Sequence, residues 1–181
     1  MAGCSQSDST RPAAVATTQP QPISPQMVDI LKLLAKGHQD KTQLAFVAQF
    51  RGLLPEVSSF NNYMSQSQGD LLNQLRLWAR SHHIGLTIED QPGSLVIAAD
   101  SMQEDEDGDK LLNASNADFQ RLYLVMMYMD YDLQIQLDKV ALQQVHAMGD
   151  PRLQAYLNSA LAINQKSQDR IWSLMHLYNL P

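Results

Sequence analysis

The residues of this 181-residue chain that could do chemistry are few and widely spaced. The single cysteine, Cys4, excludes an internal disulfide and any Cys-x-x-Cys metal or redox site. The sequence has no Glu-x-x-His pair, although a di-iron helical bundle uses two, and it lacks the GxSxG, P-loop, HExxH and dinucleotide-binding motifs. Asp130 and Asp132 flank Tyr131, but on a helix these carboxylates project on different sides, so we expect no catalytic acid pair. The pattern favours a protein that is not an enzyme.

The histidines give only a weak metal signal. His82 and His83 are adjacent, but neighbouring residues on a helix point about 100° apart, so we expect them to favour the helix C-terminal dipole rather than to clip a metal. We expect His38, which is isolated along the chain, to lie at the surface or to be hydrogen-bonded. Three methionines are typical of a gap-filled core, with a copper-binding surface as the alternative: Met126, Met127 and Met129. We expect no metal or other cofactor. If a site with rearranged ligands exists, His38 and Asp130 are its candidate ligands.

Cys4 is the most informative residue of the N-terminal segment. It ends the run Met1-Ala2-Gly3-Cys4, and small residues before a cysteine resemble the end of a bacterial lipoprotein signal, after which the cysteine carries the lipid. The residues from Ser5 to Pro22 are mostly Ser, Thr, Gln, Ala and Pro, which cannot bury enough surface to offset the entropy of ordering. We therefore expect residues 1–23 to be a lipobox remnant and a disordered tether, with lipid attachment at Cys4. A terminal thiol without lipid is the alternative.

This tether indicates where the protein acts. A lipid on Cys4 makes a membrane the first expected partner, and Ser5 after the cysteine resembles lipoproteins sorted to an outer membrane. We expect an outer-membrane lipoprotein of the bacterial cell envelope that faces the periplasm. The net charge of −6, with scattered Lys and Arg, argues against a nucleic-acid partner. No apolar run approaches the roughly 18 residues of a membrane span.

The remaining residues, 24–181, read as four helical segments. Ser24-Pro25, Pro55 and Pro151 are typical helix starts, a further start follows Ser115, and breaks are expected near Gly85 and Gly149. The first segment carries apolar residues to Phe50, with a possible kink in the polar stretch 37–43. The third segment has apolar residues in steps of three and four, which predicts the inner seam of a bundle: Phe119, Leu122, Met126, Met129, Leu133, Leu137 and Val140. We predict an all-α, four-helix up-and-down bundle.

A long crossover, residues 86–114, separates the two helical halves. Residues 86–88 and 95–97 are apolar and enclose Gln91-Pro92-Gly93, which predicts a short β-hairpin. An acidic run over residues 104–109 follows. Its glycine, Gly108, falls at position four of a calcium loop instead of six, so we interpret the run as a solvated acidic loop.

The third helical segment carries a family resemblance. Its run Phe119-Gln120-Arg121-Leu122-Tyr123-Leu124, followed by Asp130-Tyr131, resembles the domain-of-unknown-function 4142 family, which is bacterial, ferritin-like and often labelled "predicted outer membrane protein". The break at residues 149–153 is similar too, and the resemblance covers roughly residues 27–180. The same stretch resembles a related copper-associated family with a Met-Met-x-x-His-His motif, whose histidine positions are Asp130 and Tyr131 here. The resemblance implies a ferritin-like bundle.

The resemblance also implies a metal centre whose ligand positions this chain has lost. The family's glutamate in the first helix falls on or near Gln43, and its histidines fall on Gln68 and Tyr131. Neutral amides are poor substitutes for imidazole or carboxylate as transition-metal ligands. We expect Gln68 to face Ser167 instead, so that the two side chains satisfy each other and fix the helix register.

These observations predict an envelope lipoprotein of unknown biochemical role, with a non-catalytic interaction or structural bundle and a protein partner. Two alternatives remain open: a periplasmic metal-handling or stress-related ferritin-like protein with rearranged ligands, and an immunity-type or inhibitor protein.

Overall fold

The chain folds into a helical bundle. In the computed structural model, residues 23–87, 106, 108–111 and 113–178 are described, and these contain four long helices and no β-strand. The helices are α1 (Pro25–Ala48), α2 (Pro55–Ser81), α4 (Asn116–Met148) and α5 (Pro151–Leu177). The predicted β-hairpin and the tether, including Cys4, lie almost wholly outside the described residues. No helix in the described ranges combines the length and the apolar character that crossing a membrane requires.

Local signals in the sequence set most helix ends. The Ser24 side chain accepts a hydrogen bond from the Met27 amide at 3.1 Å, with Pro25 at the first helical position. Gly149 ends α4 in the left-handed conformation (φ 68°), and Asp150 then caps α5 by accepting from two backbone amides. These predicted boundaries are confirmed.

One predicted helix end and one predicted kink are wrong. Helix α2 ends at Ser81, and His83, not Gly85, adopts the left-handed conformation with φ 57°. Helix α1 runs without a break through residues 37–43 and ends at Ala48, before Phe50. Two polar residues of that stretch, His38 and Lys41, belong to the buried face of this continuous helix.

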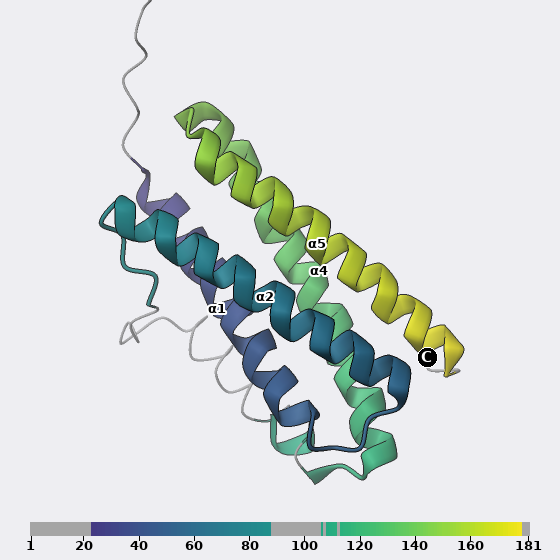
Figure 1. Ribbon diagram of the computed structural model, residues 1–181. Coiled ribbons are helices and arrows are strands. Elements are labelled where there is room, and N and C mark those ends of the chain that lie inside the picture. Colours follow the sequence, from purple (N-terminus) through teal and green to yellow (C-terminus); the bar gives the residue numbers. More distant parts are fainter. Residues whose placement is uncertain (1–22, 88–105, 107, 112, 179–181) are drawn as a thin grey trace, which may run out of the picture.

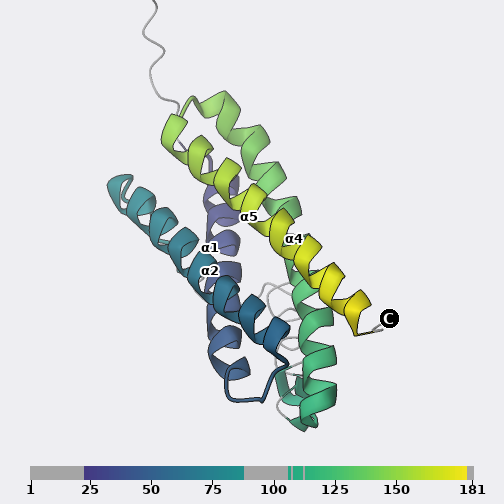
Figure 2. The same cartoon turned by 45° about the vertical axis from the view of Figure 1, so that its right-hand side comes forward.

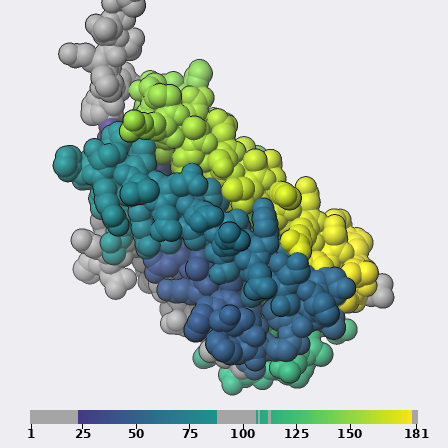
Figure 3. Space-filling view, viewed as in Figure 1, coloured from purple at the N-terminus to yellow at the C-terminus, as the bar shows by residue number. Residues whose placement is uncertain are grey.

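The helices pack as two antiparallel hairpins side by side (Figure 1). Helix α1 packs against α2 and α4, while α5 packs against α4 and α2. The turned view in Figure 2 shows the same neighbours, and Figure 3 shows side chains of α2 and α5 in contact along one face. The Trp78 indole of α2 donates to Asp150, the N-cap of α5, and Gly52 lies beside Asn116. Helices α2 and α4 therefore run in the same direction, so the long helices do not alternate strictly as in the predicted up-and-down bundle. The chain between α2 and α4 must connect opposite ends of the bundle.

The core consists of two apolar clusters with polar residues between them. One cluster surrounds the start of α1 and α5 and includes Leu31, Leu75 and Leu157. The other surrounds the start of α2 and α4 and includes Phe60 and Phe119. Most buried polar side chains of the described chain lie between these clusters: His38, Lys41, Gln68, Gln134, Asp138, Asn164 and Ser167.

The predicted inner seam of α4 is wrong in its main part. Phe119 is buried, but Met129 is 66% exposed, Leu133 61%, Val140 41% and Leu122 37%. The face that α4 turns to the core carries Tyr131, Gln134 and Asp138 among apolar residues. The apolar stripe thus lies on the outside of the bundle.

Candidate functional site

A polar layer crosses the middle of the bundle, and every helix contributes to it. We use the name central polar layer for nine residues: His38, Lys41, Gln68, Tyr131, Gln134, Asp138, Tyr156, Asn164 and Ser167. The bundle places them together because they continue the same three-and-four spacing as the apolar core. On α1 the buried positions run through Leu34, His38, Lys41 and Ala45.

Hydrogen bonds join five of these residues into a chain from Tyr156 to Asp138. His38 contacts Tyr156 Oη through Nε2 at 2.8 Å and Gln68 Oε1 through Nδ1 at 2.6 Å. Gln68 Nε2 donates to Asn164 Oδ1 at 3.0 Å, and Asn164 Nδ2 donates to Asp138 Oδ2 at 2.7 Å. Residues from all four helices thus form one buried network.

The carboxylate of Asp138 sets the direction of every bond in this chain. The Asn164 NH₂ group donates to Asp138 Oδ2, whether the carboxyl group is ionised or protonated on Oδ1, so the Asn164 oxygen faces Gln68. Gln68 must then donate to Asn164 and accept from His38, which requires the proton on Nδ1. The bare Nε2 accepts from the Tyr156 hydroxyl.

His38 is uncharged in this network. Burial lowers its pKa from 6.5 to about 4; the bond to Gln68 opposes this shift and the charge of Lys41 adds to it. A neutral imidazole with one N–H matches the one donor and one acceptor that the neighbouring side chains require. His38 is therefore fully hydrogen-bonded within the protein.

Asp138 is the end of the network whose hydrogen bonds are incomplete. Burial raises its pKa from 3.8 to about 7, against the opposing effects of the Asn164 hydrogen bond and the Lys41 charge. Its Oδ1 is the one buried side-chain oxygen or nitrogen in the described part of the chain that has no hydrogen-bond partner. An unsatisfied buried carboxylate oxygen is costly, which makes Asp138 the residue to test first.

Lys41 supplies the nearby positive charge. Its side chain is buried, its Nζ lies 3.4 Å from the Gly37 carbonyl, and it sits 5.1 Å from the centre of the Tyr131 ring. Burial lowers the pKa of the amine, while the carboxylates of Asp130, Asp40 and Asp138 raise it.

The structure brings together some of the predicted site residues and separates others. Gln68 and Tyr131 meet, since Gln68 Nε2 lies 3.2 Å from the Tyr131 hydroxyl, and His38 joins them. Gln43 is exposed on α1 and does not join the central polar layer. Asp130 is exposed on α4, so the structure does not unite it with buried His38 in one ligand set.

The predicted Gln68–Ser167 pair is wrong. The Ser167 hydroxyl donates to the Ile163 carbonyl at 2.8 Å, and the α5 partner of Gln68 is Asn164. Asn164 lies one turn before Ser167 on the same face of α5. The prediction therefore named the correct helix for the partner of Gln68 but the wrong residue.

The donor set of the central polar layer does not fit a transition metal. Both ring nitrogens of His38 are bonded to protein side chains, and its neighbours are an amide and a phenol. Within the described ranges no three His, Cys, Asp or Glu side chains gather closely enough to hold a metal ion. Asp138 offers a single oxygen without a hydrogen-bond partner in those ranges, and the positive charge of Lys41 nearby would oppose a metal cation there.

Sequence reasoning missed five members of this layer: Lys41, Gln134, Asp138, Tyr156 and Asn164. The signal that could have found them is spacing. Asp138 stands seven residues after Tyr131, and Asn164 stands seven before Ile171, so each falls in line with a buried residue two turns away.

A second feature lies on the outside, between α1 and α4. A groove of about 540 Å³ runs there, lined mostly by aliphatic side chains, among them Leu33, Leu44, Val47, Met129 and Leu133. Four charged residues also line it: Lys36, Asp40, Lys41 and Asp130.

The fold and the core define the class of this protein: a helical bundle whose central layer is closed by hydrogen bonds among polar side chains. The chain matches the family model "Domain of unknown function (DUF4142)" over residues 12–174, and it belongs to this family. The resemblance seen in the third helical segment is thereby confirmed.

A solved structure supports the fold. The crystal structure of a DUF305 fragment from Deinococcus radiodurans is similar, with a TM-score of 0.69 and 13% sequence identity, covering 86% of this chain and 99% of that one. At this identity the likeness concerns the fold alone. No curated protein matches the sequence.

Proposed function

We propose that this protein is a bacterial envelope lipoprotein whose ferritin-like four-helix bundle is a non-catalytic interaction domain. The observation that carries the proposal is the closure of the central polar layer. His38, Gln68 and Asn164 bond to one another and to neighbouring side chains, at the place where a ferritin-like bundle holds its metals.

The connectivity supports the ferritin-like assignment. Two antiparallel hairpins are joined by one long connection between α2 and α4, which run in the same direction. Ferritin-like bundles contain one such crossover, whereas simple up-down-up-down bundles have short loops throughout.

The surface supports an interaction role. Large apolar side chains that a bundle ordinarily buries are exposed on α4, including Met129 and Leu133. Exposed apolar patches on soluble domains are typical of contact sites. The partner in this proposal is a protein, and the groove between α1 and α4 borders the contact surface.

Cys4 and the polar segment that follows support the location. A coil of about 20 residues has a root-mean-square reach of roughly 25 Å, enough to hold a domain clear of lipid headgroups. The tether would join the bundle at the start of α1, the end where α4 turns into α5. In this proposal the protein is an outer-membrane lipoprotein facing the periplasm.

Two measurements test the proposal. In the native bacterium, the chain behind its own upstream sequence should take up radiolabelled palmitate and sediment with membranes, and Cys4→Ser should abolish both. Protein purified from the envelope should contain far less than one iron or copper per chain by mass spectrometry. Stoichiometric metal that is lost in His38→Ala would refute the non-catalytic, metal-free role, and membrane sedimentation unchanged in Cys4→Ser would refute the anchor.

A further inference from the structure

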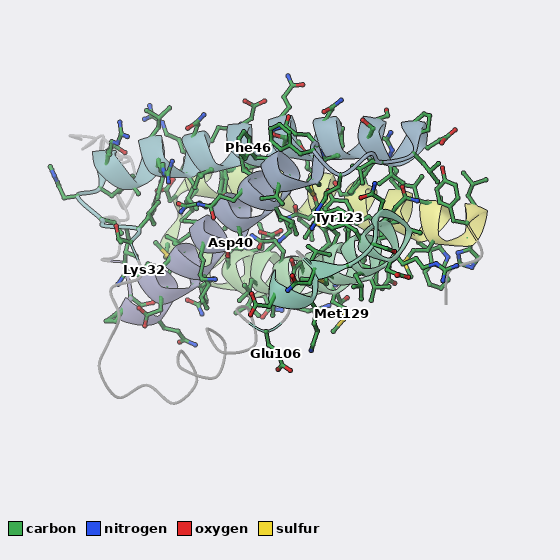
Figure 4. All side chains as sticks on the ribbon, turned by 90° about the horizontal axis from the view of Figure 1, so that it is seen from below. Lys32, Asp40, Phe46, Glu106, Tyr123 and Met129 are labelled. Atoms are coloured by element: carbon green, nitrogen blue, oxygen red, sulfur yellow. The ribbon has the colours of Figure 1, made fainter. Side chains whose placement is uncertain are left out.

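Helix α4 has a second apolar face, directed away from the bundle. We use the name outer seam for its six residues: Leu122, Met126, Met129, Leu133, Leu137 and Val140. Their spacing of three and four residues places them on one side of the helix, over a length of about 27 Å at 1.5 Å per residue. Figure 4 shows Met129 on the outer side of α4. The seam resembles a helix-packing surface, yet its central residues are more than half exposed.

The outer seam is close to symmetric along the helix. Leu122 and Val140 lie nine residues to either side of Tyr131, and Met129 and Leu133 lie two residues to either side. An identical helix running in the opposite direction therefore sets each apolar residue against another apolar residue. Such self-complementarity is what a two-fold interface requires, since the same patch is used on both subunits.

Helix α1 widens this surface. Its Leu33, Leu44 and Val47 line the groove beside the outer seam. Two helices about 9 Å apart give a face roughly 20 Å wide and 27 Å long, so two copies would cover about 1,000 Å² in total, which is about the minimum size of a biological interface and typical of a weak one.

The charges of the groove do not oppose a second copy. Lys36 and Lys41 balance Asp40 and Asp130, and Lys36 lies 2.9 Å from Asp40. Two identical grooves whose lining carries no net charge can approach without the repulsion expected from the net charge of −6 on the whole chain.

We propose that the α1–α4 face is a homodimer interface in which the outer seams of two copies pack antiparallel. The inference rests on the proposed interaction function and names the partner for this face, a second copy of the same chain. It makes one arrangement specific: Met129 of one copy faces Leu133 of the other.

Analytical ultracentrifugation of the full chain carrying Cys4→Ser tests the association. We expect a concentration-dependent species of twice the 20.3 kDa chain mass. Leu133→Lys should raise the dissociation constant at least tenfold. Leu77→Lys is the matched control, because Leu77 is 64% exposed on α2 and Leu133 is 61% exposed on α4. A monomer at every concentration, or an equal effect of the two lysines, overturns the proposal.

Cysteine cross-linking tests the orientation. In the Cys4→Ser background, a mixture of Met129→Cys and Leu133→Cys chains should give mixed disulfide dimers faster than either variant alone. Preferential same-residue cross-links would indicate a parallel pair and overturn the antiparallel arrangement. Photo-cross-linking from position 133 in the envelope then separates the two proposals. If the only product is a different envelope protein, or this chain's own crossover in a monomer, the homodimer is wrong; the first of these outcomes leaves the interaction function standing.

Discussion

Replacing Asp138 by asparagine should make the bundle more stable at neutral pH. The carboxylate is buried in the central polar layer and one of its oxygens has no partner among the described residues. Asparagine keeps the size and still offers an oxygen to Asn164, but it has no charge to desolvate. The titratable neighbours Lys41, His38 and Tyr156 are the same in the wild-type protein and in the variant, so the comparison isolates the Asp138 carboxyl group.

The magnitude follows from the pKa of the carboxyl group. Burial raises this pKa from 3.8 to about 7, so between these pH values the folded chain holds a proton that the unfolded chain has released. The free energy of unfolding therefore falls as the pH rises through this window and levels off above about pH 7. At about 1.4 kcal/mol per pKa unit the full effect is about 4 kcal/mol. The Asp138→Asn variant has no carboxyl group at this position, so its free energy of unfolding does not fall in this way as the pH rises.

Urea unfolding followed by circular dichroism at 222 nm, from pH 4 to pH 9, measures the difference. The two proteins should have similar free energies of unfolding near pH 4, and the variant should be more stable by about 2–4 kcal/mol above pH 7. The lowered pKa of His38 destabilises the fold as the pH falls from 6.5 toward 4. Both proteins contain His38, so this contribution cancels in the difference between their free energies of unfolding. Asp132→Asn, at an exposed position of the same helix, is the control and should change little. A difference that does not vary with pH, or that grows toward acid, would refute the account of the central polar layer.

Three further predictions concern single positions. Gly37→Ala should destabilise the protein by about 1–2 kcal/mol in urea unfolding, because the added methyl group would meet the Gln134 amide. Gly69→Ala, in open space on α2, should stabilise the protein by about 0.5–1 kcal/mol. A change of stability in the same direction for both variants would contradict the close packing at Gly37. Asp150→Ala should cost about 1–2 kcal/mol by removing the α5 cap and the acceptor of an α2 indole, and a loss below 0.3 kcal/mol would show that the cap matters little. Nitrogen-15 NMR should find His38 neutral at pH 6, with its proton on Nδ1; an Nε2–H tautomer would reverse the assigned direction of the hydrogen-bond chain.

The sequence predicted the helices because their ends depend on local chemistry. A serine or aspartate cap, a proline in the first turn and a left-handed glycine act within four residues, and Ser24, Pro55 and Gly149 behaved as expected. His83 was the exception. Its left-handed conformation follows a turn in which the Ile84 amide bonds to the Ala79 carbonyl. Only the folded backbone shows which of two candidate residues closes that turn.

The face that α4 buries could not be read from apolar residues alone. The helix has two faces with the correct spacing, and the more apolar of the two lies outside. The inner face is held by Tyr131 and Asp138, whose partners come from α2 and α5. Since hydrogen bonds between distant helices leave no trace in a hydropathy pattern, the choice between the faces depends on residues far away in the sequence.

The two faces of α4 have a common physical explanation. A bundle that closes its centre with Gln68, Asn164 and Asp138 gains less from burial there than an apolar core would, and it keeps a buried carboxylate at a cost. Turning α4 to bury Met129 and Leu133 would bring apolar surface inward but leave the acceptors and donors of the other three helices unpaired. The polar layer therefore fixes the rotation of α4, and the apolar residues that this rotation leaves exposed supply the driving force for association with a partner.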